Sequence, residues 1–287
     1  MVEQARRLGK SLLEFILFSN GYIALCAVVM CQATAILFQR ELPAFFLPFI
    51  FVATVSSYSL HWYLTPTTLD STERNQWNRR HKLLLIGIGI GSALVALVLF
   101  TQLVSYYRYF IPIVVATLLY TAPKIDRVPF RYLRRVAILK TAYLALVWTL
   151  VTGVLPIVLT GPGWNMALTV WAINRFLFLY SICFWFDYRD RVADRRSRWL
   201  TIVSMMNPKR AATVFYGIAS CFALTLILLL QHGMSFPKVI ALSLPMCFLA
   251  GSVPYIPHWS SDYWYYVYLD GLLLLSGLTL LAAESFV

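Results

Sequence analysis

The chain has 287 residues, of which 60% are hydrophobic and only 13% charged, and its mean hydropathy is +0.71. This composition excludes an ordinary soluble domain, because so much apolar surface could not be covered in water. The net charge of +12 would indicate nucleic acid in a soluble protein, but the basic residues are distributed as in a membrane protein, so we expect no nucleic-acid partner.

Apolar stretches long enough to span a bilayer recur along the whole chain. They lie at about 15–38, 43–64, 83–104, 109–123, 136–160, 165–186, 211–231, 236–254 and 264–283. The stretch at 109–123 is short and contains Pro112. The pattern predicts an all-α integral membrane protein with nine transmembrane helices, built as one polytopic domain over residues 1–287.

The basic residues fix the expected orientation. Most of the 24 lysines and arginines fall in alternate connections, at 6–10, 74–82, 124–140 and 189–210. Cytoplasmic loops carry such an excess, so the N-terminus is expected in the cytoplasm and the protein in a bacterial inner membrane. The five cysteines lie in apolar runs without paired spacing and are expected to be small buried side chains.

Three polar residues lie within the expected spans, namely Asn20, Arg175 and Asp270. Such residues usually face the interior of a helical bundle, because contact with lipid is costly. We expect Arg175 and Asp270 to face inward and to pair with each other. A buried pair that fixes helix packing and a pair that serves a cavity both remain open.

Three of the twelve acidic residues, Asp187, Asp190 and Asp194, follow the apolar run that ends at Phe186. Their intervals of three and four place the side chains within roughly a 60° arc of one helical face. Such a face suits Mg²⁺, which binds carboxylates together with diphosphate oxygens. A cluster of ion pairs, Asp187 with Arg191 and Asp194 with Arg198, is the alternative that the residues leave open.

The segment from Phe186 to Asp194, with Thr201 after it, resembles the second aspartate motif of the UbiA superfamily of intramembrane prenyltransferases. It is most similar to the menaquinone-type form, R-D-x-x-x-D followed by Gly-Lys-x-Thr. Four residues match by position, namely Arg189, Asp190, Asp194 and Thr201, whereas Arg198 and Trp199 stand where that form has Gly-Lys. Weaker similarities are Phe18-Ser19-Asn20, Tyr120-Thr121-Ala122-Pro123 and the segment from Leu139-Lys140 to Val147-Trp148.

The resemblance implies nine helices around a central, lipid-accessible cavity that opens toward two cytoplasmic loops, at about 65–82 and 187–210. It also implies Mg²⁺ as cofactor and a polyprenyl diphosphate as substrate. Asp190 and Asp194 would be the catalytic metal ligands, Asp187 a supporting ligand, and Lys140 and Arg134 contacts to the diphosphate.

The first aspartate motif of the family, N-x-x-x-D-x-x-x-D, is degenerate in this chain. Ser57, His61 and Thr65 stand at its intervals, so both carboxylates are missing. His61 is then either a phosphate partner on the cavity wall or a polar residue at a helix end. Tyr58 and Tyr180 are candidates for stabilising a carbocation.

The sequence therefore favours a UbiA-like membrane protein that binds a polyprenyl diphosphate with Mg²⁺ and transfers the prenyl group to an aromatic or lipid-soluble acceptor. Loss of the first motif leaves two alternatives without turnover: an isoprenoid-lipid-binding protein, or a protein that organises a membrane complex. A transporter or flippase is the third, with Arg175 and Asp270 on its path, although no inverted repeat is visible.

Overall fold

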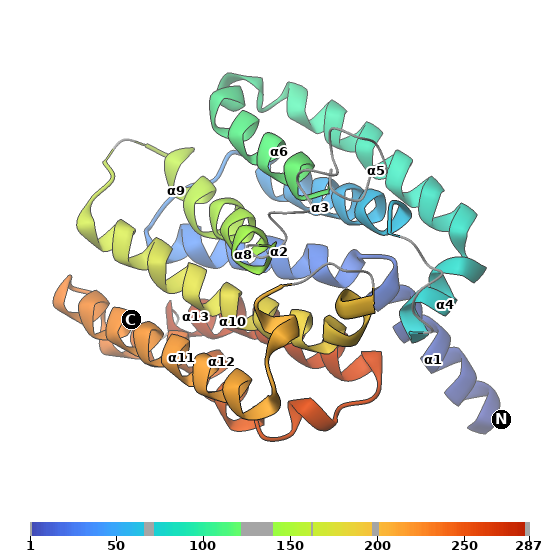
Figure 1. Cartoon of the computed structure of the whole chain (residues 1–287). Helices are drawn as coiled ribbons and strands as arrows, with labels where there is room; N and C mark the ends of the chain where they lie inside the picture. The colour runs from blue at the N-terminus through green and yellow to red at the C-terminus, as the bar shows by residue number, and fades with distance from the viewer. Residues whose placement is uncertain (1, 66–71, 122–139, 162, 197–200, 285–287) are drawn as a thin grey trace.

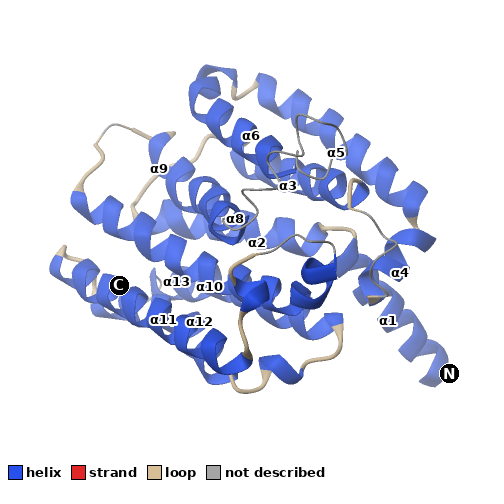
Figure 2. Cartoon of the chain, viewed as in Figure 1, coloured by secondary structure: helices blue, strands red, loops and turns tan. Residues whose placement is uncertain are grey.

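The computed structural model describes residues 2–65, 72–121, 140–161, 163–196 and 201–284. Within these ranges all regular structure is helical (Figure 2). The α-helices are α1 (Val2–Phe18), α2 (Gly21–Leu37), α3 (Phe46–Tyr63), α4 (Glu73–Arg80), α5 (Lys82–Thr101), α6 (Tyr107–Thr121), α8 (Lys140–Thr149), α9 (Leu155–Val158), α10 (Met166–Arg196), α11 (Pro208–Gln231), α12 (Phe236–Ser252) and α13 (Asp270–Glu284). Two π-helical segments, η4 (Leu150–Val154) and η7 (Trp264–Leu269), and three short 3₁₀ turns, η1 (Val104–Tyr106), η5 (Val203–Met205) and η6 (Ile256–His258), complete the chain.

Each apolar stretch expected from the sequence contains a helix, which confirms the all-helical fold class. By length and composition, five helical stretches of the described residues could cross a membrane: Lys82–Thr101, Lys140–Val158, Met166–Val192, Pro208–Gln231 and Trp264–Glu284. Arg6–Phe18 and α2 would make a sixth if the 57° bend between them lies within one span. The finer count of nine spans stays a prediction.

Local sequence explains several helix boundaries. Asn20 adopts a left-handed conformation (φ 70°) at the bend between α1 and α2, a conformation that asparagine tolerates better than most residues. Thr72 and Asn207 cap the N-termini of α4 and α11, where their side chains accept hydrogen bonds from the backbone N–H of Asn75 and Arg210. The helix α10 continues without a break to Arg196, so the three acidic residues lie inside its last turns.

The helices form a closed circuit in chain order (Figure 1). Neighbours along the chain pack together: α2 on α3, α3 on α5, α6 on α8, α8 on α10, α10 on α11, α11 on α12 and α12 on α13. The aromatic rings of Phe49, Phe100 and Phe110 join α3, α5 and α6. The circuit closes where α13 packs on α2. That contact requires Gly277, because a Cβ there would lie 2.7 Å from Val29 Cγ1.

At one end the middle of the circuit is filled. The segment η4 packs against both α2 and α10. Its carbonyl groups, which the π-helical geometry redirects, are bound by side chains: Thr34 Oγ1 donates to Thr152 O (2.7 Å), Trp171 Nε1 to Gly153 O (3.2 Å) and Cys31 Sγ to Val151 O (3.4 Å). Cys31, Thr34, Thr152 and Trp171 have no exposed surface. We call this region the packed half, and the opposite region, around the last turns of α10, the acid end.

Candidate functional site

The acid end begins with Asp187, which lies on α10 opposite the first turn of α8. Lys140 Nζ lies 3.6 Å from Asp187 Oδ1, and Thr141 Oγ1 donates a hydrogen bond to Oδ2. The side chains of Lys140 and Asp187 are only 22% and 10% exposed. Lys140, expected to contact a diphosphate, is therefore adjacent to an acidic residue expected to support a metal ion.

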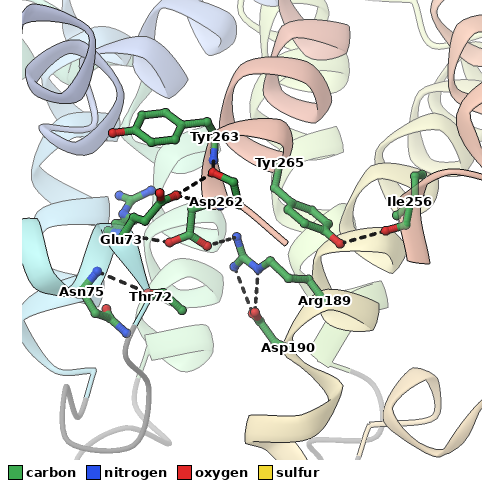
Figure 3. Close-up of polar contacts among 11 residues, drawn as sticks. Thr72, Glu73, Asn75, Arg189, Asp190, Ile256, Asp262, Tyr263 and Tyr265 are labelled. Atoms are coloured by element: carbon green, nitrogen blue, oxygen red, sulfur yellow. Dashed lines mark hydrogen bonds and ion pairs between the residues drawn. The ribbon is translucent and has the colours of Figure 1, made fainter. Parts of the chain in front are cut away.

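Asp190 is bound by its neighbour Arg189. Arg189 donates from Nε to Oδ1 (2.7 Å) and from Nη2 to Oδ2 (3.2 Å) (Figure 3). The third guanidinium nitrogen of Arg189, Nη1, lies 3.8 Å from Asp262 Oδ1, and the group packs on the rings of Tyr265 and Tyr266. Asp190 therefore has a cation of its own in this structure.

The helix α4 is hydrogen-bonded to Asp262 and its neighbour Ser261. Arg74 N donates to Asp262 Oδ2 (3.0 Å), while Glu73 Oε2 accepts from Ser261 Oγ (2.7 Å) and from Asp262 N (3.1 Å) (Figure 3). The Arg74 guanidinium donates to Asn20 Oδ1 (2.6 Å) and lies over the ring of Trp62 at 4.1 Å. The helix α4 is thus held against the residues that precede η7.

Asn20 is buried as expected, and its side chain makes two hydrogen bonds at the bend between α1 and α2. Its side chain accepts from Arg74 and donates from Nδ2 to Ser59 Oγ (3.1 Å). Nearby, Tyr263 Oη donates to Glu14 Oε1 (2.7 Å). Burial raises the pKa of Tyr263, and the hydrogen bond to Glu14 adds to this, so the hydroxyl stays a donor at neutral pH.

His61 belongs to a stack of aromatic rings that leads toward the acid end. Its ring stacks on Tyr120 at 5.1 Å, and Tyr120 stacks on Tyr143 at 6.4 Å. The Tyr120 hydroxyl is an electrostatic neighbour of Lys140, Asp187 and Asp190. One tyrosine, Tyr120, therefore lies between His61 and the charged groups of the acid end.

Four residues between these groups share an unusual environment. Tyr58, Tyr120, Lys140 and Cys183 are half-buried, and each keeps accessible surface. They come from α3, α6, α8 and α10, and electrostatic interactions join every pair among them except Tyr58 and Lys140. By contrast, Cys31, Thr34, Thr152 and Trp171 of the packed half have no exposed surface.

Arg175 and Asp270 are both buried, at 2% and 7% exposure, but the expected pair between them is wrong. Arg175 Nη1 donates to Ser276 Oγ (3.2 Å), and the guanidinium lies 4.7 Å from the Trp171 ring centre. Ser276 follows Asp270 by six residues, about 9 Å along a helix. The register of α10 against α13 therefore places Arg175 in the packed half and Asp270 nearer the acid end.

The remaining predicted residues are placed as follows. Asp194 is buried on the last turns of α10. Thr201 is fully buried, and its Oγ1 accepts from Ser204 N (3.0 Å), so it shapes the turn η5. Tyr180 is half-buried and stacks on Phe176 at 5.8 Å. Arg134 lies outside the described residues.

The acid end does not form a metal centre from protein groups alone. Within residues 2–65, 72–121, 140–161, 163–196 and 201–284, no three His, Cys, Asp or Glu side chains come together as metal ligands. Asp187 and Asp190 are instead held by Lys140 and Arg189.

A separate apolar groove of about 480 Å³ lies on the outside of α12 and η7. It is lined by Leu244, Cys247, Phe248, Gly251, Ser252, Tyr255 and Tyr268. It contains none of the residues singled out from the sequence.

Sequence reasoning missed the part played by Glu73, Arg74 and Asp262. The polar run from Thr72 to Arg80 did carry a signal, since a threonine cap ahead of a strongly polar helix is typical of a short surface helix. Nothing in the sequence related that helix to Asp262, which lies 188 residues further along the chain.

Comparison of the chain with models of protein families, with curated proteins and with solved structures found no match.

Proposed function

We propose that this chain is a multi-pass membrane protein of the UbiA type that binds a polyprenyl diphosphate at the acid end. The helix α5 supports the membrane placement. Its mean hydropathy is 2.7, and not one of its residues is buried. Leu83, Leu97 and Val98 are 85%, 65% and 67% exposed. An apolar helix of 20 residues that packs on α3 and leaves its outer side chains exposed is suited to lipid.

The observation that carries the proposal is the environment of Lys140. It is an ammonium group at the end of a helix circuit, paired to Asp187 and next to the stacked rings of Tyr120 and His61. Half-buried groups enclosed by protein are what the wall of an internal chamber presents. A diphosphate fits beside the ammonium group, and the prenyl chain fits among the apolar and aromatic side chains of α3, α6 and α10.

The charges at the acid end support a divalent cation that arrives with the substrate. Lys140 and Arg189 are already paired to Asp187 and Asp190, so a diphosphate bound beside them would be stabilised by a further cation. Mg²⁺ typically uses one or two carboxylates and completes its shell with phosphate oxygens and water. Asp190 and Asp194, one helical turn apart, are the carboxylates we assign to it, with Asp187 and Lys140 beside them. When bound, the ion would stabilise the charge of the leaving diphosphate.

Binding is tested with purified protein in detergent and geranylgeranyl diphosphate, with Mg²⁺ or with EDTA. Lys140→Gln should weaken binding by about tenfold or more, because it removes a charge-assisted contact in a poorly solvated site. Lys238→Gln is the matched control, since Lys238 is also a partly buried, ion-paired lysine but bonds Glu284 (2.7 Å) at the other end of α13. It should bind as the wild type does.

Two results would contradict the proposal: no binding of the diphosphate by the wild type under either condition, or equal losses in Lys140→Gln and Lys238→Gln. Geranylgeraniol, which lacks the diphosphate, should bind more weakly than the diphosphate and should not distinguish the two variants.

Transfer of the prenyl group is the second part of the proposal, and release of pyrophosphate measures it. Binding of the prenyl diphosphate without release of pyrophosphate would favour the non-catalytic alternative. One observation supports that alternative. At the first-motif positions, His61 stacks on Tyr120 and Thr65 Oγ1 donates to the His61 carbonyl (2.8 Å), so neither offers the carboxylates of the family pattern.

A further inference from the structure

The helix α1 turns an apolar face away from the rest of the described chain. The helix projects beyond its neighbours at the N-terminal end (Figure 1). In a helix that turns by about 100° per residue, five large apolar side chains of α1 fall within roughly a 160° arc. Each of the five is between 41% and 75% exposed: Leu8, Leu12, Leu13, Phe15 and Ile16. This face is therefore available to a partner outside the chain.

Polar residues occupy the rest of the circumference of α1. Among them are Gln4, Arg6, Arg7, Lys10, Ser11 and Glu14. Arg6 and Lys10, four residues apart, lie along one edge of the apolar face, next to Leu13. The Lys10 side chain is 67% exposed, although its Nζ lies 3.8 Å from Glu14 Oε1. The helix is thus amphipathic, whereas α5 is apolar on all sides.

The protein holds α1 by its polar side and its C-terminal end. Tyr263 Oη donates to Glu14 Oε1 (2.7 Å). Phe18 is buried, and its ring packs against those of Trp77, Tyr263 and Tyr266. Glu14 and Phe18 are four residues apart and share one side of the helix, opposite the apolar face. These contacts hold α1 so that its apolar face points outward.

The direction of α1 differs from that of α2. The stretch Arg6–Phe18 makes an angle of 57° with α2, and Asn20 at the bend has a left-handed conformation. Since α2 packs along α3 and α13 within the circuit, a helix at 57° to it lies nearer the membrane plane than the membrane normal. An amphipathic helix in that plane places its apolar face at the acyl-chain boundary and its polar face among the headgroups.

We propose that α1 is an interfacial helix that binds anionic phospholipid at the membrane surface. The five apolar side chains enter the acyl-chain boundary, while Arg6 and Lys10 extend beside them to the headgroup phosphates. Charge favours lipid over a second copy of the chain, because two such faces brought together would also bring their basic edges together. The inference rests on the membrane placement in the proposed function, but not on prenyl diphosphate binding.

The placement of α1 is tested with spin labels on the full chain in bilayers of phosphatidylcholine and phosphatidylglycerol. Cys221→Ala and Cys247→Ala first remove the two exposed cysteines. Ser11→Cys and Leu12→Cys then put labels at neighbouring exposed positions, about 100° apart around the helix. The Leu12 label should be relaxed mainly by oxygen, which concentrates in lipid, and the Ser11 label mainly by a water-soluble nickel chelate.

Three outcomes would overturn the placement of α1. Both labels in lipid would make α1 part of a transmembrane span, and both labels in water would show that it does not dock. A Leu12 label shielded from both reagents would show that protein covers the apolar face.

Leu97→Cys on α5 is the control for the membrane itself. Leu97 is an exposed residue of an apolar helix, so its label should be accessible to oxygen if the chain spans the bilayer. A Leu97 label in water would contradict the membrane placement of the whole protein. A Leu97 label in lipid, together with a failed pattern at Ser11 and Leu12, would contradict the inference about α1 alone.

Recognition of the anionic headgroup is measured by native mass spectrometry, as retention of phosphatidylglycerol relative to phosphatidylcholine. Replacing two basic residues together, Arg6→Gln with Lys10→Gln, should lower this ratio by roughly tenfold. Lys209→Gln with Arg210→Gln is the matched control, because it removes the same two charges from exposed positions in the first turn of α11. That variant should keep most of the ratio. Equal losses in the two double variants, or no preference in the wild type, would overturn the assignment of anionic lipid to α1.

Discussion

The packed half and the acid end are built from the same helices but differ in how their polar groups are bonded and how far they are buried. In the packed half, the carbonyl groups of Val151, Thr152 and Gly153 in η4 each accept from a side-chain donor, and Trp171 and Thr152 have no exposed surface. At the acid end, charged groups are held by one another and several polar residues keep accessible surface. The first arrangement serves stability, and the second leaves groups for a ligand to contact. Changes in the two regions should therefore affect different measurements.

The largest expected effect is in the packed half. Trp171 has no exposed surface and lies between the Phe38 ring (5.5 Å) and the Arg175 guanidinium (4.7 Å). Trp171→Ala should lower the free energy of unfolding by about 3–5 kcal/mol, because it leaves a large cavity. In detergent, the melting temperature should fall markedly, while the folded fraction should keep its affinity for the prenyl diphosphate. If Trp171→Ala lost affinity for the prenyl diphosphate without losing stability, the division into a stabilising packed half and a ligand-binding acid end would be contradicted.

A smaller effect is expected where the circuit closes. An added methyl group at Gly277 would meet Val29 Cγ1 at 2.7 Å and Val29 O at 3.0 Å. Gly277→Ala should therefore destabilise the fold by about 1–3 kcal/mol by forcing α13 away from α2. Gly217→Ala is the matched control, because Gly217 lies within α11 with nothing within 4 Å of an added Cβ. It should be neutral or slightly stabilising, and equal thermal shifts for both variants would disprove the close contact.

The smallest effect is expected in the network that holds α4. Ser261→Ala removes the hydroxyl that donates to Glu73 Oε2 (2.7 Å). The loss should be about 0.5–1 kcal/mol, since the contact is solvent-exposed and a second donor, Asp262 N, remains. Ser243→Ala, whose hydroxyl bonds only Ile240 O within α12, provides the comparison in thermal unfolding. A larger loss in Ser243→Ala than in Ser261→Ala would argue against the network.

Much of the architecture could be predicted from hydropathy alone, because spans of apolar residues determine where the helices form. The acidic face of α10 was also predictable, since the intervals between Asp187, Asp190 and Asp194 follow directly from helix geometry. The pairing of Arg175 with Asp270 was not predictable. It depends on the register between α10 and α13, and Ser276 rather than Asp270 lies opposite Arg175.

The partners of the acidic residues were the second feature that the sequence did not predict. Sequence intervals favoured Arg191 for Asp187, whereas in the structure Lys140 binds Asp187 and Arg191 Nη1 donates to the Tyr188 carbonyl (2.7 Å). The contact between Lys140 and Asp187 joins α8 to α10, and a tertiary contact of this kind has no local signature. The distribution of charge along the sequence therefore identified the acid end but not which basic residue pairs with which acidic residue.

The most direct test of the account is photocrosslinking with a prenyl diphosphate analogue that carries a diazirine on its prenyl chain. Mass spectrometry of the labelled protein then locates the chain within the fold. The account predicts labels on α3, α6 and α10, near Tyr58, Tyr120 and Cys183, that disappear when unlabelled geranylgeranyl diphosphate is added. Labels confined to the outer groove of α12 and η7 or to the exposed surface of α5, with none at those three residues, would contradict it.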